Sequence, residues 1–169
     1  MQKIMIQTCC LSKDQISEKL EQQGIRTNLY AQQFFSHPRF SAEYAGKITL
    51  LIVSLREIGF ENGASLPEIY QKLPQAGLKP CPPQTGLFLR LAWRDQPESE
   101  NAILTGTHEV PDQAVTVLSE LLEENDDFPK GLYLRNVEGI LWLRGYVCES
   151  QYCFPADAVF AFETVEQND

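Results

Sequence analysis

Hydrophobic residues follow two different spacings along the chain, and the change falls near residue 78. Before it, apolar positions recur every three or four residues, which is typical of amphipathic helices. Ser12 and Gln15 have the spacing of a capping box, so they predict a helix that ends near Gly24. A second helix is predicted over residues 28–36, where a His-Pro pair ends it.

Residues 48–55 are ambiguous, because a buried strand and a buried helix both give a short apolar run. Leu51 and Leu55 share helical spacing, so we favour a helix here. A clearer helix start follows, since Ser65 and Glu68 form a second capping box ahead of an apolar stripe. The first part of the chain is therefore predicted to be helical.

Beyond residue 78, apolar and polar residues alternate, which is typical of strands that bury one face. Three single strands are predicted, at residues 87–93, 101–108 and 158–162. An amphipathic helix over residues 112–125 separates two of them.

The strongest local strand signal is a hairpin over residues 132–147. Its turn, Asn136-Val137-Glu138-Gly139, suits a type I turn with a G1 bulge. The predicted fold is α+β, with N-terminal helices (residues 1–77) packed on a C-terminal antiparallel sheet (residues 78–169) that carries the one inserted helix. The 169 residues fit one compact domain.

The charge balance narrows the range of partners. The chain has 23 acidic and 14 basic residues and a formal net charge of −9, which repels nucleic acid and anionic lipid. No apolar run approaches the length of a membrane span, and the N-terminus lacks the apolar core of a signal peptide. We therefore expect a cytoplasmic protein that binds neither nucleic acid nor membrane, and its oligomeric state stays open.

Cofactor and metal motifs are not apparent in the sequence. The glycines are isolated, so no phosphate-binding loop is predicted. Cys148 and Cys153 are separated by four residues with no second cysteine pair to complete a zinc site. We expect no metal and no cofactor, and an odd count of five cysteines fits free thiols.

Residues 53–97 resemble a segment found in small bacterial proteins of no assigned function. The shared pattern is Gly-Phe-x-x-Gly-Ala, then Gly-Leu-x-x-Cys-Pro, then Arg-Leu-x-aromatic-x-Asp-Gln-Pro. The matching residues are Gly59, Phe60, Gly63, Ala64, Gly77, Leu78, Cys81, Pro82, Arg90, Leu91, Trp93, Asp95, Gln96 and Pro97. The chain departs from this pattern at Pro74 and at residues 112–125, and the resemblance implies no activity, cofactor or catalytic residue.

Arginine and aromatic residues in the sheet half form the first candidate site. Arg90 and Arg94 share one side of the predicted strand, and Trp142, Arg144 and Tyr146 share one side of the hairpin. Tryptophan, tyrosine and arginine are the residues most enriched at the centres of protein interfaces. We predict a non-catalytic interaction or accessory protein that binds a partner protein through Arg90, Arg94, Asp95, Trp142, Arg144 and Tyr146.

The alternative is a small enzyme or ligand-binding protein. In that interpretation an anionic metabolite lies between the helices and the sheet, in a pocket lined by Cys81, Arg90, Asp95 and His108. Lys79 would help to lower the pKa of the Cys81 thiol. A structural role for Cys81 as a small buried residue is the simpler explanation.

Overall fold

The structure is a computed structural model that describes residues 1–100 and 112–165. Its helices are α1 (Lys13–Gln22), α2 (Leu29–Ser36), α3 (Leu66–Lys72) and α4 (Thr85–Ala92), with 3₁₀ turns at Arg56–Ile58 and Leu73–Ala76. Its strands are β1 (Gln2–Thr8), β2 (Arg26–Thr27), β3 (Gly46–Ser54), β4 (Ala64–Ser65), β5 (Leu78–Lys79), β6 (Val115–Val117), β7 (Gly131–Val137), β8 (Ile140–Tyr146), β9 (Cys153–Phe154) and β10 (Val159–Thr164).

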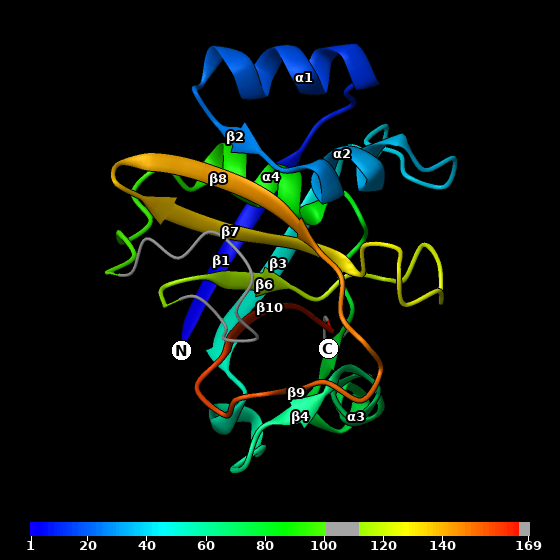
Figure 1. Ribbon diagram of the computed structural model, residues 1–169, viewed down its shortest axis with the longest axis vertical. Helices are drawn as coiled ribbons and strands as arrows, with labels where there is room; N and C mark the ends of the chain where they lie inside the picture. The colour runs from blue at the N-terminus through cyan, green and yellow to red at the C-terminus, as the bar shows by residue number, and fades with distance from the viewer. Residues whose placement is uncertain (101–111, 166–169) are drawn as a thin grey trace.

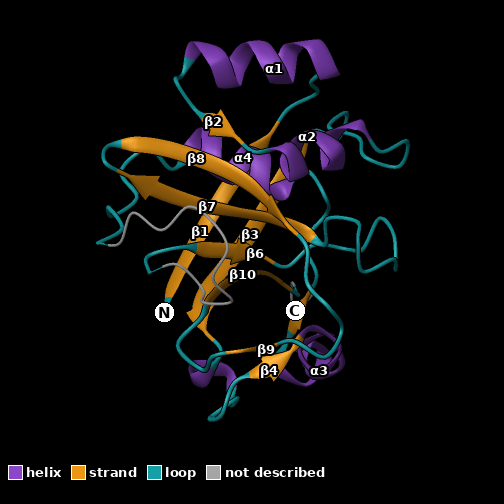
Figure 2. Cartoon of the chain, viewed as in Figure 1, coloured by secondary structure: helices purple, strands orange, loops and turns teal. Residues whose placement is uncertain are grey.

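One curled mixed sheet forms the centre of the molecule (Figures 1 and 2). Its strand order is β1-β3-β10-β6-β7-β8-β2, and β5 pairs with β10. The β10–β6 and β2–β8 pairs are parallel and the others antiparallel, while β4 and β9 form a separate ribbon. The α+β class is therefore confirmed, but the sheet is not purely antiparallel and it takes strands from both halves of the chain.

The prediction of a helix over residues 48–55 is wrong, because β3 lies there as an inner strand between β1 and β10. Ile48, Leu50 and Ile52 point into one core and Val53 into a second core on the other face. A strand that is buried on both faces gives a nearly continuous apolar run, and helical spacings occur in such a run by chance.

The predicted strand over residues 87–93 is instead the helix α4. Its residues from Thr85 to Arg90 are all buried, beneath the sheet face formed by β1, β7 and β8. A helix that is buried all round has no polar stripe to reveal its period. The alternation of leucines with other residues in this segment was therefore misleading.

The predicted helix over residues 112–125 is also wrong, since this segment contains β6 and the loop that follows it. Val115, Thr116 and Val117 are all buried, because β6 lies between β10 and β7. The predicted strand over residues 101–108 lies outside the described residues.

Local signals, in contrast, are confirmed. The Ser12–Gln15 capping box begins α1, and the Ser65–Glu68 capping box begins α3. The hairpin is present as β7 and β8. Its turn differs, because Val137 pairs with Ile140 and the two turn residues both have positive φ, 51° at Glu138 and 76° at Gly139. This is a two-residue type I′ turn, with no bulge.

The two faces of the sheet carry separate cores. Residues of α1, α2 and α4 pack on one face, where the larger core includes Phe34, Leu89 and Leu143. On the other face, α3 and the β4–β9 ribbon cover mainly the part formed by β3 and β10, with Phe160 and Phe162 in the core and Tyr146 of β8 packed against it. The rest of that second face, on β7, β8 and β2, carries the arginine and aromatic residues.

Helix α2 is fastened to the sheet at Gly145. The Asn28 amide donates to the Gly145 carbonyl (2.9 Å) and accepts from the Gly145 N–H (2.8 Å), and the same side-chain oxygen accepts from the Ala31 N–H at the start of α2. A Cβ on residue 145 would lie 2.5 Å from the carbonyl carbon of Tyr30 and 2.6 Å from the Ala31 nitrogen. Only glycine permits this approach.

Replacing Gly145 with alanine is expected to lower the free energy of unfolding by about 2 kcal/mol, because two backbone segments must separate to admit the methyl group. Urea denaturation followed by circular dichroism measures this. Gly24→Asn is the control, since Gly24 has left-handed φ but no neighbour near its Cβ position. Equal stability of the two variants would show that the approach at Gly145 is not tight.

Candidate functional site

Arg90 does not lie on an exposed face, as the strand prediction required. It is part of α4 and has 0% of its surface exposed. Its guanidinium donates to Gln96 Oε1 (2.6 Å) and to the Trp93 carbonyl. Burial, with the nearby charge of Arg94, lowers the pKa of Arg90 to about 10, so the group is still charged at neutral pH. In the described part of the chain, no carboxylate pairs with it.

Gln96 fixes Arg90 and the following segment to the sheet. Its Nε2 donates to the Leu134 carbonyl (3.1 Å) and the Gln113 carbonyl (2.9 Å), next to its bond from Arg90. Its own carbonyl accepts from Asn136 Nδ2 (2.9 Å). The Arg90–Gln96 pair, which belongs to the segment that suggested a binding site, therefore serves as a structural link between α4 and β7.

Arg94 and Asp95 point elsewhere. Arg94 is exposed and donates to the side-chain and backbone oxygens of Gln23, at the end of α1. Asp95 is exposed in the loop after α4. The three charged residues predicted to share one surface are thus separated, because the segment is a helix followed by a loop.

Replacing Gln96 with alanine is expected to reduce the free energy of unfolding by about 3 kcal/mol. The buried Arg90 loses an acceptor and the buried Leu134 carbonyl loses a donor, and unsatisfied buried groups are costly. The measurement is urea denaturation, with Asp95→Ala as the neighbouring control. That exposed carboxylate should change stability by no more than about 0.5 kcal/mol. Similar losses in both variants would contradict the role of Gln96.

Trp142 and Arg144 do share one face of β8, as predicted. Two guanidinium groups lie over the Trp142 ring, with Arg26 Cζ at 6.0 Å and Arg144 Cζ at 5.0 Å from its centroid. Arg144 Nε also donates to the Tyr133 hydroxyl (2.8 Å). We call these four residues, Arg26, Tyr133, Trp142 and Arg144, the Arg–Trp surface.

Tyr146 is on the same face of β8 but belongs to the second core. Its ring packs edge-on against Phe154, and its hydroxyl is buried without a hydrogen-bond partner among the described residues. Burial raises the pKa of Tyr146 well above its usual value. Arg26 was missed by sequence reasoning, because nothing in the sequence predicts that the two residues of β2 pair with β8.

Three residues of the alternative pocket, Cys81, Arg90 and Asp95, are among the described residues. Cys81 has 0% of its surface exposed, and its backbone bonds to Leu118 and Glu120. It precedes α4, whereas Arg90 lies in the last turn of that helix. Burial raises the pKa of the Cys81 thiol, so the nearby Lys79 does not make it reactive. His108 lies outside the described residues.

Thiol reactivity tests this placement. With a colorimetric thiol reagent at pH 8, the exposed Cys9, Cys10 and Cys153 should react fast. Cys81 should react only after denaturation, and Cys148 slowly, because burial raises the pKa of Cys148 to about 11 and both thiols stay protonated at pH 8. Mass spectrometry of the labelled peptides identifies each site. Rapid native labelling of Cys81 would contradict its burial.

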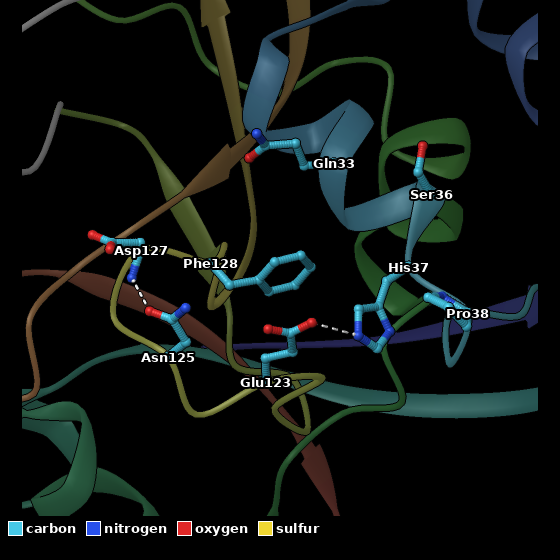
Figure 3. A pocket seen from close by; sticks show the side chains of 8 residues that line it. All are labelled: Gln33, Ser36, His37, Pro38, Glu123, Asn125, Asp127 and Phe128. Atoms are coloured by element: carbon cyan, nitrogen blue, oxygen red, sulfur yellow. Dashed lines mark hydrogen bonds and ion pairs between the residues drawn. The ribbon is translucent and has the colours of Figure 1, made fainter.

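An open hollow lies between the C-terminal end of α2 and the loop that joins β6 to β7 (Figure 3). Its volume is about 410 Å³. His37 and Glu123 face each other in it, with 3.0 Å between His37 Nε2 and Glu123 Oε1. The lining residues are Gln33, Ser36, His37, Pro38, Glu123, Asn125, Asp127 and Phe128. Sequence analysis did not predict this hollow, since His37 and Glu123 are 86 residues apart.

Metal ligands do not gather within the described residues, where no three His, Cys, Asp or Glu side chains are placed to hold one ion. Among the helices of the same residues, none has the length and apolar character needed to cross a membrane. Comparison of the chain with protein families, with curated proteins and with solved structures finds no match.

Proposed function

We propose that the chain is a non-catalytic interaction protein of the cytoplasm, which binds a partner protein through the Arg–Trp surface. The observation that carries the proposal is that the guanidinium groups of Arg26 and Arg144 both lie over the Trp142 ring. Arginine and tryptophan supply most of the binding energy at many interfaces. Of the residues expected from the sequence, Trp142 and Arg144 remain in this proposal.

The surface is also partly preorganised. Arg144 is held by the Tyr133 hydroxyl and by contact with Trp142, so its side chain loses little further freedom on binding. The two strands beneath it, β7 and β8, are paired along their whole length. A surface on a rigid support loses less conformational freedom on binding than a surface on a mobile one.

Charge defines the partner. Arg26 and Arg144 place two cations next to one tryptophan on a chain whose net charge is −9. We therefore expect a segment of another protein that carries carboxylates beside an apolar side chain, since bidentate pairing with a carboxylate suits arginine. The anionic-metabolite alternative is not favoured, because Cys81 and Arg90 are both fully buried.

Replacing Trp142 with alanine is expected to weaken binding of the partner by about 30-fold or more, the loss typical of a central interface tryptophan. Arg26→Glu should weaken binding by a similar factor. It should also reduce the dependence of the affinity on salt concentration, because the charge of Arg26 is lost. The partner is first captured from source cells by the wild-type protein, and the dissociation constants are then measured by calorimetry with purified components.

Lys47→Glu provides the matched control, since it makes the same charge change at an exposed position on β3. It should bind as the wild type does. If the Trp142 and Arg26 variants are folded and bind the captured partner normally, the Arg–Trp surface is not the binding site.

A further inference from the structure

We propose that the hollow between α2 and the β6–β7 loop binds a guanidinium group, at a site separate from the Arg–Trp surface (Figure 3). The ligand would contact the Glu123 carboxylate and the Phe128 ring. The proposal rests on the geometry of this hollow and does not depend on the proposed function.

The hydrogen bonds of His37 leave the hollow negatively charged. The backbone N–H of Arg39 donates to His37 Nδ1 (3.1 Å), so this nitrogen carries a lone pair rather than a proton. The ring proton is then on Nε2, from which it is donated to Glu123 Oε1 (3.0 Å). A neutral imidazole that orients a carboxylate does not cancel its charge. The pair therefore has a net charge of −1, and no bond engages Glu123 Oε2 among the described residues.

An aromatic side chain, Phe128, lies next to this charge. The Phe128 ring packs against the His37 ring, with 5.1 Å between the ring centroids and an interplanar angle of 63°. In Figure 3 the Phe128 ring lies beside the Glu123 carboxylate, with the Gln33 amide on the far side of the hollow. A planar cation can stack on such a ring while its N–H groups bond to the carboxylate.

The two segments that form the hollow, the end of α2 and the β6–β7 loop, are held together without a ligand. Arg39 Nη1 donates to the Leu122 carbonyl (2.9 Å), which ties the end of α2 to the loop. Lys130 Nζ donates to the carbonyls of Glu124 (3.0 Å) and Asn125 (2.9 Å), which closes the loop from its other side. These cations bond to backbone oxygens, and Lys130 also pairs with the Asp126 carboxylate (3.7 Å), so among the described residues their ion pairs and hydrogen bonds do not include Glu123. A site that is already formed loses less free energy on binding.

The shape and the donor set indicate which cation fits. A volume of about 410 Å³ is within the range of small-ligand sites, and the hollow is open enough for a side chain to enter from outside. A hard metal ion requires several oxygen ligands together, and no three His, Cys, Asp or Glu side chains of the described residues are placed to hold one, although Asp127 also lines the hollow. A guanidinium uses both the Glu123 carboxylate and the Phe128 ring, because it is planar and has several donors in one plane.

The test uses capped arginine, N-acetyl-arginine amide, titrated into the full chain and followed by two-dimensional NMR. Saturable shifts at residues around the hollow are expected, with a dissociation constant on the order of millimolar. N-acetyl-citrulline amide has nearly the same shape but no charge, and it should bind at least about 10-fold more weakly. N-acetyl-lysine amide should also bind more weakly, since it lacks the planar group.

Glu123→Gln should weaken capped arginine about 10-fold or more, while Glu124→Gln should change it less than about 2-fold. Both remove one carboxylate from the same loop, but Glu124 does not line the hollow. The glutamine carbonyl at position 123 can still accept from His37 Nε2, so the loop should keep its structure, which a thermal melt checks. Phe128→Leu provides a second variant that leaves the charge unchanged and should weaken binding several-fold.

The guanidinium group could belong to an arginine side chain of a partner protein or to a small compound. A glycine-flanked pentapeptide with a central arginine distinguishes these two sources. Binding at least about 10-fold tighter than capped arginine supports the side chain of a partner protein, and equal binding supports a small guanidinium compound. The proposal is overturned if capped arginine gives no saturable shifts, if citrulline binds equally well, or if Glu123→Gln has no effect in a folded protein.

Discussion

A guanidinium that is removed from water needs hydrogen-bond partners, and Arg90 finds them for its two terminal nitrogens in neutral oxygens of Gln96 and Trp93, while its Nε has no partner among the described residues. The requirement is strict, because the group stays charged at neutral pH and no described carboxylate pairs with it. Gln96 accepts the Arg90 hydrogen bond while its amide nitrogen donates to the Leu134 and Gln113 carbonyls. The loop after α4 therefore lies against β7.

The described part of that loop lies along β7. Gln96 Nε2 bonds to the Leu134 carbonyl (3.1 Å) and the Ser99 N–H to the Asn136 carbonyl (2.8 Å), both on β7, which lies next to β6 in the sheet. The β6–β10 pair is parallel, and the chain between these two strands runs through β7, β8 and β9 rather than through a hairpin. The buried Arg90–Gln96 pair thus connects α4 with β7.

Sequence reasoning succeeded where the signal is local and failed where burial is complete. Capping boxes at Ser12 and Ser65 and the hairpin of β7 and β8 depend on residues only a few positions apart. By contrast, β3 and α4 have partners on all sides, and their sequences lack the polar stripe that would reveal a period. For the same reason, Arg90 was predicted to lie on the surface although it is buried. In the predicted strand, its side chain would have been on the exposed face.

The candidate sites were only partly predictable for a related reason. Trp142 and Arg144 alternate on one strand, so the sequence places them together correctly. Arg26 joins them through a two-residue pairing between segments more than a hundred positions apart. The His37–Glu123 contact likewise requires two loops that meet only in the folded chain. A sequence pattern predicts neither the β2–β8 pairing nor the His37–Glu123 contact.

Both candidate sites are positioned by α2. Its N-cap, Asn28, follows β2 directly and bonds to Gly145 on β8, so it fixes Arg26 beside Trp142. Its C-cap is His37, which orients Glu123. Eight helical residues span about 12 Å. The cationic surface and the anionic hollow are therefore held at a set separation by one short helix, and the close approach of that helix to Gly145 determines the geometry of both.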